Sequence, residues 1–373
     1  MKEFILAPDS FKGTLTAKQV CEIEAEVIRR HIPDAHIRTI PMADGGEGMV
    51  DAYLNLMGGQ RITVPVTGPL GDMVEAEYGL LPDGSAVVEM AAVAGLPLVQ
   101  GREDPLHTTT YGVGELLLHA AEHGVTRVLL GLGGSCTNDC GIGMAAALGF
   151  RFLDGAGQQV PPLACNLAKI YHIVPPGQLP PLELRAACDV DNPLLGEKGA
   201  TFTFGPQKGA NEEMLEQLEG GMTHFAWILE EYCGKPVASI PGAGAAGGMG
   251  AMVTGLLGGT LLPGTELLLE SVGFDELLRN TDVVITGEGR ADGQSVRGKV
   301  PGTVAAHCKK ADVPCVLLCG SLGAGAEKLY DRGVTAMFGG AESGRSLDRI
   351  RATAAEELAA LTETAIRTLM VKN

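Results

Sequence analysis

The chain has 373 residues, 45% of them hydrophobic, and a formal net charge of −17 at pH 7. This length corresponds to about two domains, and the hydrophobic content excludes a disordered chain. The negative charge and an aromatic content of only 4% argue against a nucleic-acid-binding protein, which needs a basic surface or stacking platforms. Glycine is in excess: its 53 residues are about twice the usual share of ~7%, which predicts many tight loops.

The N-terminal residues alternate strand and helix patterns. Residues 4–7 form a short apolar strand, and Thr16 with Gln19 forms the capping box that opens a helix. A second strand is expected at 36–40 and a second helix at 49–57. This order, strand then helix twice over, predicts the beginning of a parallel sheet.

The pattern changes after residue 60, where short strand patterns are separated by turn signals, as in antiparallel or mixed sheets. Residues 151–240 are irregular apart from one clear helix. The elements expected in this middle part are strands at 61–66, 74–80, 86–90 and 127–132, helices at 113–123 and 214–232, and a small-residue helix that follows the loop GGSCTNDCGIG and ends at Leu148.

Three apolar, β-rich runs at 282–286, 313–319 and 334–338 restore the first pattern, each followed by a glycine loop and a helix. We therefore expect an α/β fold with two domains. Residues 1–60 and 280–373 would form a flavodoxin- or Rossmann-like, doubly wound parallel-sheet domain. Residues 61–279 would form an inserted α/β domain with a mixed sheet.

No secretory signal or membrane span is expected. The first apolar run is too short for a signal sequence. The uncharged stretch 236–265 is dense in glycine and contains Pro241 and Pro263, so we interpret it as a glycine loop and one buried helix. The nine cysteines form no CxxC pair, which favours reduced thiols in a cytoplasmic protein.

Five glycine-rich loops lie near the ends of expected strands. In open parallel sheets ligands bind beyond the carboxyl ends of the strands, and backbone N–H groups in such loops favour anions such as phosphate. The loops are ADGGEG (43–48), GLGGSCTNDCG (131–141), CDVDNPLLG (188–196) with FGPQKG (204–209), PGAGAAGGMG (241–250) and TGEGRADGQSVRGK (286–299).

Two familiar nucleotide-binding motifs match only in part. Residues 242–247 fit GxGxxG, but Pro241 precedes them and no βαβ unit frames them, so a dinucleotide site is not favoured. Residues 293–299 fit the GxxxxGK of a P-loop, but Val300 stands where a Mg²⁺-binding Ser or Thr is required.

Acidic and basic residues gather in the glycine loops. Carboxylates among glycines favour Mg²⁺ chemistry on phosphates, and interspersed cations suit an anionic substrate. Asp139 or Asn138 has an alternative role as the cap of the helix that follows. The carboxylates are Asp9, Asp44, Glu47, Asp139, Asp189, Asp191, Glu288 and Asp292, and the cations are Lys12, Lys208, Arg290, Arg297 and Lys299.

Together these loops resemble those of the bacterial glycerate kinase family of the glycerate 2-kinase type. The resemblance implies ATP- and Mg²⁺-dependent phosphorylation of D-glycerate to 2-phosphoglycerate in a cleft between two α/β domains. Cys136 and Cys140 replace small residues usual in the family, and if exposed they would make the enzyme sensitive to oxidation. The motifs, in family order, are APDSFKGTLTA, ADGGEG, TTYGVGEL, GLGGSCTND, ACDVDNPLLG, FGPQKGA, PGAGAAGGMGA and VITGEGRADGQSVRGKVP.

Chemistry placed on these motifs assigns the candidate site. Arg290 is expected to bind the carboxylate of glycerate, and Lys12 the transferring phosphoryl group. Asp189, with Asp292 as the second choice, is expected to accept the proton of the acceptor hydroxyl. Further substrate contacts are expected from Ser10, Asn192, Gln294 and Ser295, contacts with ATP phosphates from Gly133, Gly134, Ser135, Thr137, Asn138, Asp139 and Lys299, and Mg²⁺ binding from Asp44 and Glu47.

Other functions remain open on the sequence alone. They are formation of 3-phosphoglycerate, a kinase for another small hydroxy acid, an NAD-dependent oxidoreductase, and a non-catalytic sensor of a nucleotide or sugar acid. The expected protein is a cytoplasmic monomer or homodimer that binds small molecules, without nucleic acid or a membrane as partner.

Overall fold

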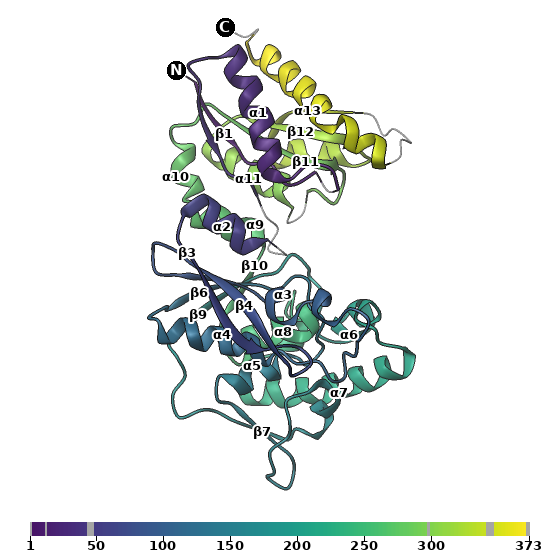
Figure 1. Ribbon diagram of the computed structural model, residues 1–373. Helices are drawn as coiled ribbons and strands as arrows, with labels where there is room; N and C mark the ends of the chain where they lie inside the picture. Colours follow the sequence, from purple (N-terminus) through teal and green to yellow (C-terminus); the bar gives the residue numbers. More distant parts are fainter. Residues whose placement is uncertain (1, 12, 43–47, 297–298, 341–346, 371–373) are drawn as a thin grey trace. The chain divides into compact units, whose positions relative to one another are not determined.

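The computed structural model describes residues 2–11, 13–42, 48–296, 299–340 and 347–370, and the fold is α/β as expected. The chain divides into two compact units, coloured by sequence in Figure 1: unit 1 comprises Met1–Asp44 and Thr265–Asn373, and unit 2 comprises Gly45–Gly264. The sequence predicts an inserted domain with boundaries at 60/61 and 279/280, and the two compact units divide earlier, at 44/45 and 264/265.

Unit 1 is a doubly wound parallel sheet. In the described residues the sheet has five strands in the order β13-β12-β11-β1-β2, and every neighbouring pair is parallel. The strands are β1 (Glu3–Leu6), β2 (His36–Thr39), β11 (Val283–Ala291), β12 (Cys315–Leu322) and β13 (Val334–Gly340). The helices are α1 (Ala17–His31), α9 (Gly264–Ser271), α10 (Phe274–Leu278), α11 (Val300–Ala311), α12 (Leu329–Arg332) and α13 (Leu347–Met370).

Helices cover both faces of the unit 1 sheet. Leu6, Ile285 and Leu318 belong to one buried cluster with Ile28 of α1 and Ile366 of α13, and these two helices lie side by side in Figure 1. On the other face α11 packs against β11 and β12. The capping box predicted at Thr16 and Gln19 opens α1. Strands covered on both faces explain why their sequences are continuous apolar runs.

A buried histidine ties the start of the second unit 1 segment to its sheet layer. His307 of α11 is 7% exposed, and its Nδ1 lies 2.5 Å from Asp275 Oδ1 of α10. Its Nε2 lies 3.1 Å from Glu266 Oε1 of α9. Because α9 and α10 are held to α11 in this way, residues expected in the inserted domain belong to unit 1.

Unit 2 is built on a mixed sheet. In the described residues this sheet has six strands in the order β10-β9-β6-β5-β4-β3. The pairs β3–β4 and β4–β5 are antiparallel and the others are parallel. The strands are β3 (Gln60–Thr67), β4 (Met73–Leu80), β5 (Ala86–Glu89), β6 (Arg127–Gly131), β9 (Glu183–Ala187) and β10 (Thr260–Leu262), with a separate hairpin of β7 (Arg151–Leu153) and β8 (His172–Val174). The helices are α2 (Met49–Met57), α3 (Ala91–Ala94), α4 (Tyr111–Glu122), α5 (Ile142–Ala147), α6 (Ala200–Phe204), α7 (Glu212–Cys233) and α8 (Ala245–Gly255).

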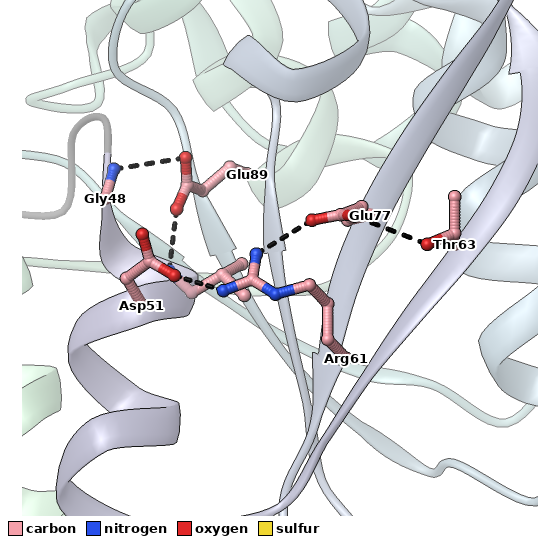
Figure 2. Close-up of polar contacts among 7 residues, drawn as sticks. Gly48, Asp51, Arg61, Thr63, Glu77 and Glu89 are labelled. Carbon is pink, nitrogen blue, oxygen red and sulfur yellow. Dashed lines mark hydrogen bonds and ion pairs between the residues drawn. The ribbon is translucent and has the colours of Figure 1, made fainter.

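Polar contacts hold α2 in unit 2 (Figure 2). The boundary between the first segment of unit 1 and unit 2 therefore lies before this helix. The carboxylate of Glu89, at the end of β5, accepts hydrogen bonds from Gly48 N at 3.2 Å and Val50 N at 2.6 Å, the first turn of α2. Arg61 of β3 forms an ion pair with Asp51 of α2 and another with Glu77 of β4 at 2.8 Å. The sequence pattern around α2 suits a parallel sheet, but these contacts assign the helix to the mixed one.

The uncharged stretch is a glycine loop and a buried helix, as expected. Residues 246–248 all have positive φ, between +53° and +94°, at the beginning of α8. Gly247 lies against the backbone of the 131–141 loop, where an added Cβ would be 2.1 Å from Thr137 O. Gly242 and Gly244 lie against the 188–196 loop, where an added Cβ at Gly244 would be 2.3 Å from Pro193 O. The three glycines of the GxGxxG pattern therefore allow close packing against these two loops. No helix in the described residues has the length and apolar character of a membrane span.

Candidate active site

The carboxyl ends of β1 and β11 mark the point in unit 1 where strand order reverses. From β1 the chain continues through α1 to β2 on one side, and from β11 through α11 to β12 on the other. Ligands of open parallel sheets bind at such a point. The two loops are joined there, because Asp9 N–H donates to Gly287 O at 2.8 Å. Topology therefore selects residues 8–10 and 287–295 as a candidate site.

Glu288, Arg290 and Asp292 alternate along the end of β11 and the first residue after it, so they share one side of the strand. The side chain of Arg290 is 58% exposed, and its Nε is 3.5 Å from Asp292 Oδ2. A second Asp292 oxygen accepts from Gln294 N at 2.9 Å. Asp292 thus orients an exposed fork of N–H donors that suits a small carboxylate.

Glu288 is the buried member of this group. It is 6% exposed, and its Oε1 has no hydrogen-bond partner among the described residues. Burial raises the pKa of Glu288 to about 7, opposed by a hydrogen bond with Ser295 and the charge of Lys299, and increased by the charges of Asp9 and Asp292. A carboxyl with this pKa can exchange a proton near neutral pH.

The predicted substrate-binding residues of this loop take different roles. Ser295 is fully buried, and its Oγ accepts from Asp292 N at 3.0 Å, so it orders the loop. Gln294 and Lys299 are exposed, with Lys299 immediately before α11. Ser10 is exposed after β1 and its backbone N–H donates to Asp9 Oδ1 at 2.6 Å. The four residues lie around one edge of the unit 1 sheet.

In unit 2 the predicted phosphate loop is organised around a buried lysine. Lys208 is 1% exposed, and its Nζ donates to Ser135 Oγ at 3.0 Å and to Thr137 O at 2.5 Å. Burial lowers the pKa of this ammonium to about 8. Ser135, Thr137 and Asn138 are themselves buried, whereas Gly133 is half-buried and Gly134 exposed. Only the glycine turn, with φ +74° at Gly134, therefore presents its backbone to solvent.

Asp139 takes the capping role that the sequence left open. Its carboxylate accepts from Thr110 N at 2.9 Å, Thr110 Oγ1 at 2.8 Å, Gly141 N at 3.0 Å and Gly143 N at 3.2 Å. Burial raises its pKa and these donors oppose the rise. Four donors leave this fully buried carboxylate directed at the start of α5 and at Thr110 rather than at a phosphate.

Cys136 and Cys140 do not meet the condition of exposure on which oxidation sensitivity depends. They are 1% and 0% exposed, and burial raises the pKa of Cys136 to about 12 and that of Cys140 further. Thiols without thiolate character and without access to solvent react slowly with oxidants. Both residues pack as small apolar side chains of the loop.

Asp189, the first choice as proton acceptor, follows β9 in unit 2 and is exposed. Its Oδ1 accepts from Gly264 N, the first residue of α9, at 3.0 Å. The side chain of Asn192 donates from Nδ2 to Lys198 O at 2.7 Å, and the backbone carbonyl of Asn192 accepts from Gly244 N. These contacts order the 188–199 loop, and the substrate roles of Asp189 and Asn192 stay predictions.

Four residues of the predicted set lie outside the described residues: Lys12, Asp44, Glu47 and Arg297. Of the others, the structure gathers Asp9, Asp292, Ser295 and Lys299 around Glu288, and Arg290 pairs with Asp292. Glu288 was absent from the predicted catalytic group. The sequence contains a pattern that indicates its place in the site, because VITGEGRA can be interpreted as one strand in which residues 288 and 290 lie on the same side.

The chain is similar to known proteins along almost its full length. The model of the glycerate kinase family matches residues 4–370. The chain belongs to the glycerate kinase family. The family assignment makes this protein a kinase and implies ATP as the phosphoryl donor.

Individual glycerate kinases agree with this assignment. A glycerate kinase from Halalkalibacterium halodurans is 48% identical, covering 91% of this chain and 90% of the relative. The Escherichia coli protein named glycerate 2-kinase is 42% identical, covering 90% of each. A crystal structure from Salmonella typhimurium LT2, provisionally named glycerate kinase 2, superposes with a TM-score of 0.85 at 37% identity and covers 100% of this chain and 99% of its own.

Proposed function

We propose that this protein transfers the γ-phosphoryl group of ATP to the 2-hydroxyl of D-glycerate, forming 2-phosphoglycerate and ADP. The family match and the name of the Escherichia coli relative support the substrate and the position. We also propose that the enzyme acts in the cytoplasm on small molecules alone.

The observation that carries the proposal is the exposed Arg290 guanidinium, oriented by Asp292 at the strand-order reversal of the unit 1 sheet. Arginine binds carboxylates through two parallel N–H donors. Glycerate is a carboxylate with hydroxyls on the next two carbons, so a carboxylate held at Arg290 lies beside the residues able to handle the hydroxyl proton. Lys299 supplies a second exposed positive charge for phosphoryl oxygens.

Mg²⁺ is proposed as the companion of ATP. Mg²⁺ keeps several waters and is held by substrate phosphates with only one or two carboxylates. In the described residues no three His, Cys, Asp or Glu side chains form a metal-binding group. Asp44 and Glu47 stay the proposed protein ligands. When bound, Mg²⁺ neutralises charge that develops on the phosphates.

The test is ADP release measured in a coupled assay with D-glycerate and ATP. We expect turnover that depends on both substrates, and carbon NMR that shows phosphate on carbon 2 of the product. A signal on carbon 3 would move the proposal to the 3-hydroxyl.

Three other outcomes would overturn the proposal. ATP binding without glycerate-dependent turnover would indicate a sensor, and a nicotinamide absorbance change would indicate an oxidoreductase. Faster turnover of another small hydroxy acid would replace D-glycerate as substrate. We expect turnover and not binding alone. We also expect no nicotinamide chemistry, because the GxGxxG glycines pack against protein backbone.

A further inference from the structure

The described carboxylates considered as proton acceptors differ in how their oxygens are used. Asp292 accepts from Gln294 N and pairs with Arg290, and Asp189 accepts from Gly264 N. Glu288 has a hydrogen bond with Ser295, but its Oε1 is buried and has no partner in the described part of the chain. An unsatisfied buried carboxyl oxygen costs stability and calls for a functional explanation.

The register of β11 places this oxygen near the proposed substrate position. Glu288 and Arg290 are two residues apart on one side of the strand, a separation of about 6.6 Å along it. In glycerate the carbon that bears the 2-hydroxyl is bonded directly to the carboxylate carbon. A glycerate carboxylate held by the Arg290 guanidinium can therefore direct its 2-hydroxyl back along the strand toward Glu288.

We propose that Glu288 accepts the proton of the acceptor hydroxyl, in place of Asp189 or Asp292. The inference rests on the proposed function and adds one residue to it. The glycerate oxygen forms a bond to the γ-phosphorus of ATP, the bond from that phosphorus to the β–γ bridging oxygen breaks, and ADP leaves. The proton of the hydroxyl moves to Oε1 of Glu288 and is later released to solvent.

The surroundings of Glu288 suit this role. In the described residues the charged or titratable groups that face it are Asp9 after β1, Asp292 and Lys299 in the loop after β11, and Cys319 of β12. The two aspartates favour the protonated form of Glu288, and Lys299 favours the ionised form. With a pKa of about 7, Glu288 is ionised in a large fraction of molecules above neutral pH and is still basic enough to accept a proton.

The experiment compares Glu288→Gln with the wild type. The amide keeps the size of the side chain and a hydrogen bond to Ser295 but cannot accept a proton. We expect kcat to fall by about 100-fold or more, with KM for glycerate and ATP within a few-fold. In the wild type, kcat/KM should fall toward acid pH with an apparent pKa near 7, because Glu288 becomes protonated. This acid limb should be absent from the variant.

Glu24→Gln is the matched control, because Glu24 is also a buried glutamate of unit 1 with unpartnered oxygens in the described residues. It should keep the wild-type kcat and pH profile. Glu288→Asp restores a carboxyl, so its kcat should be at least tenfold higher than that of Glu288→Gln. A purely structural role of Glu288 would not require this recovery.

Failure of the inference and failure of the proposed function give different results. If the wild type does not phosphorylate glycerate, the proposed function is wrong. If it does, a Glu288→Gln enzyme within a few-fold of wild type, or one that keeps the full acid limb, overturns the role of Glu288. Should Glu288→Gln not fold, Glu288→Asp decides: the shorter side chain withdraws the carboxyl from the hydroxyl, so we expect a kcat below that of the wild type and a displaced acid limb. An unchanged kcat and acid limb would contradict the proposal.

Discussion

Two buried glutamates of unit 1 show how position separates a candidate catalytic carboxyl from a structural one. Glu24 is 0% exposed on α1, and burial alone raises its pKa well above the usual value. Glu288 is buried at the strand-order reversal, among Asp9, Asp292 and Lys299. Both have oxygens without partners in the described residues, so both cost stability, but only Glu288 lies where a substrate is expected.

Replacing Glu24 with Leu should therefore stabilise the protein. The folded pKa is raised, so the native state binds more protons than the unfolded state above pH ~4.5, and wild-type stability falls as pH rises toward the folded pKa. Glu24→Leu removes this loss and the unpaired oxygens, and we expect a gain of about 1–3 kcal/mol at pH 7. Urea unfolding at pH 5 and pH 8 measures both the gain and the change of slope.

The control for this substitution is Glu22→Leu, an exposed position on the same helix. It should change stability by less than about 0.5 kcal/mol and leave the pH slope as in the wild type. An equal gain at both positions would show that the effect comes from leucine in the helix, contrary to the burial argument.

At the scale of single residues, the sequence predicts which loops contain functional side chains, but it does not predict whether those side chains point into the protein or toward a ligand. Asp139, Ser135 and Thr137 are polar residues in a glycine loop, and from the sequence they read as ligand contacts. Their inward direction depends on Lys208 and Thr110, more than 25 residues away in the chain, as the contact between Thr110 and Asp139 shows. Local patterns carry no information on partners at that separation.

At the scale of elements, the beginning of α8 is tightly constrained. Ala246, Gly247 and Gly248 are in the left-handed region, and Cys140 N–H donates to Gly247 O at 2.9 Å. The 131–141 loop and the 241–250 loop are thus packed backbone to backbone. This contact needs both a left-handed φ and the absence of a Cβ at residue 247.

Gly247→Ala should be strongly destabilising, and Gly258→Ala separates its two causes. The two glycines have φ of +68° and +67°, but an added Cβ at residue 247 would be 2.1 Å from Thr137 O, whereas nothing lies within 4 Å at residue 258. We expect a loss of about 3 kcal/mol or more for Gly247→Ala and about 1 kcal/mol for Gly258→Ala. Thermal unfolding of both variants checks this, and equal losses would assign the whole effect to φ.

Most elements could be predicted from hydrophobic periodicity and caps, including the capping box of α1 and the antiparallel pairing of β3 with β4. The domain boundaries could not, because they depend on contacts of α2 with Glu89 and Arg61 and of α9 with His307. Short helices such as α6 and α10 have too few residues to show a period.

At the scale of the whole molecule, unit 2 is one continuous segment and unit 1 is two. Unit 2 contains its own buried cluster and both strands of every sheet pair within it. We expect a fragment of residues 45–264 to fold alone, with cooperative thermal unfolding by circular dichroism. A fragment of residues 265–373 lacks β1, β2 and α1, and it should unfold without a cooperative transition. A folded second fragment, or a first one without a transition, would contradict this.

The parallel pairing of β1 with β11 also determines when, during synthesis, the unit 1 sheet can form. Glu3 and Asp282 are bonded across 279 positions of the chain. At a translation rate of ~5–20 residues per second this separation is roughly 15–60 s. For that interval the first strand has emerged from the ribosome without β11, its neighbour on one side, while the inserted unit completes its fold behind it. An apolar strand with an unsatisfied edge is a binding site for chaperones and a starting point for aggregation, so the nascent chain depends on protection of its first forty residues until the last hundred arrive.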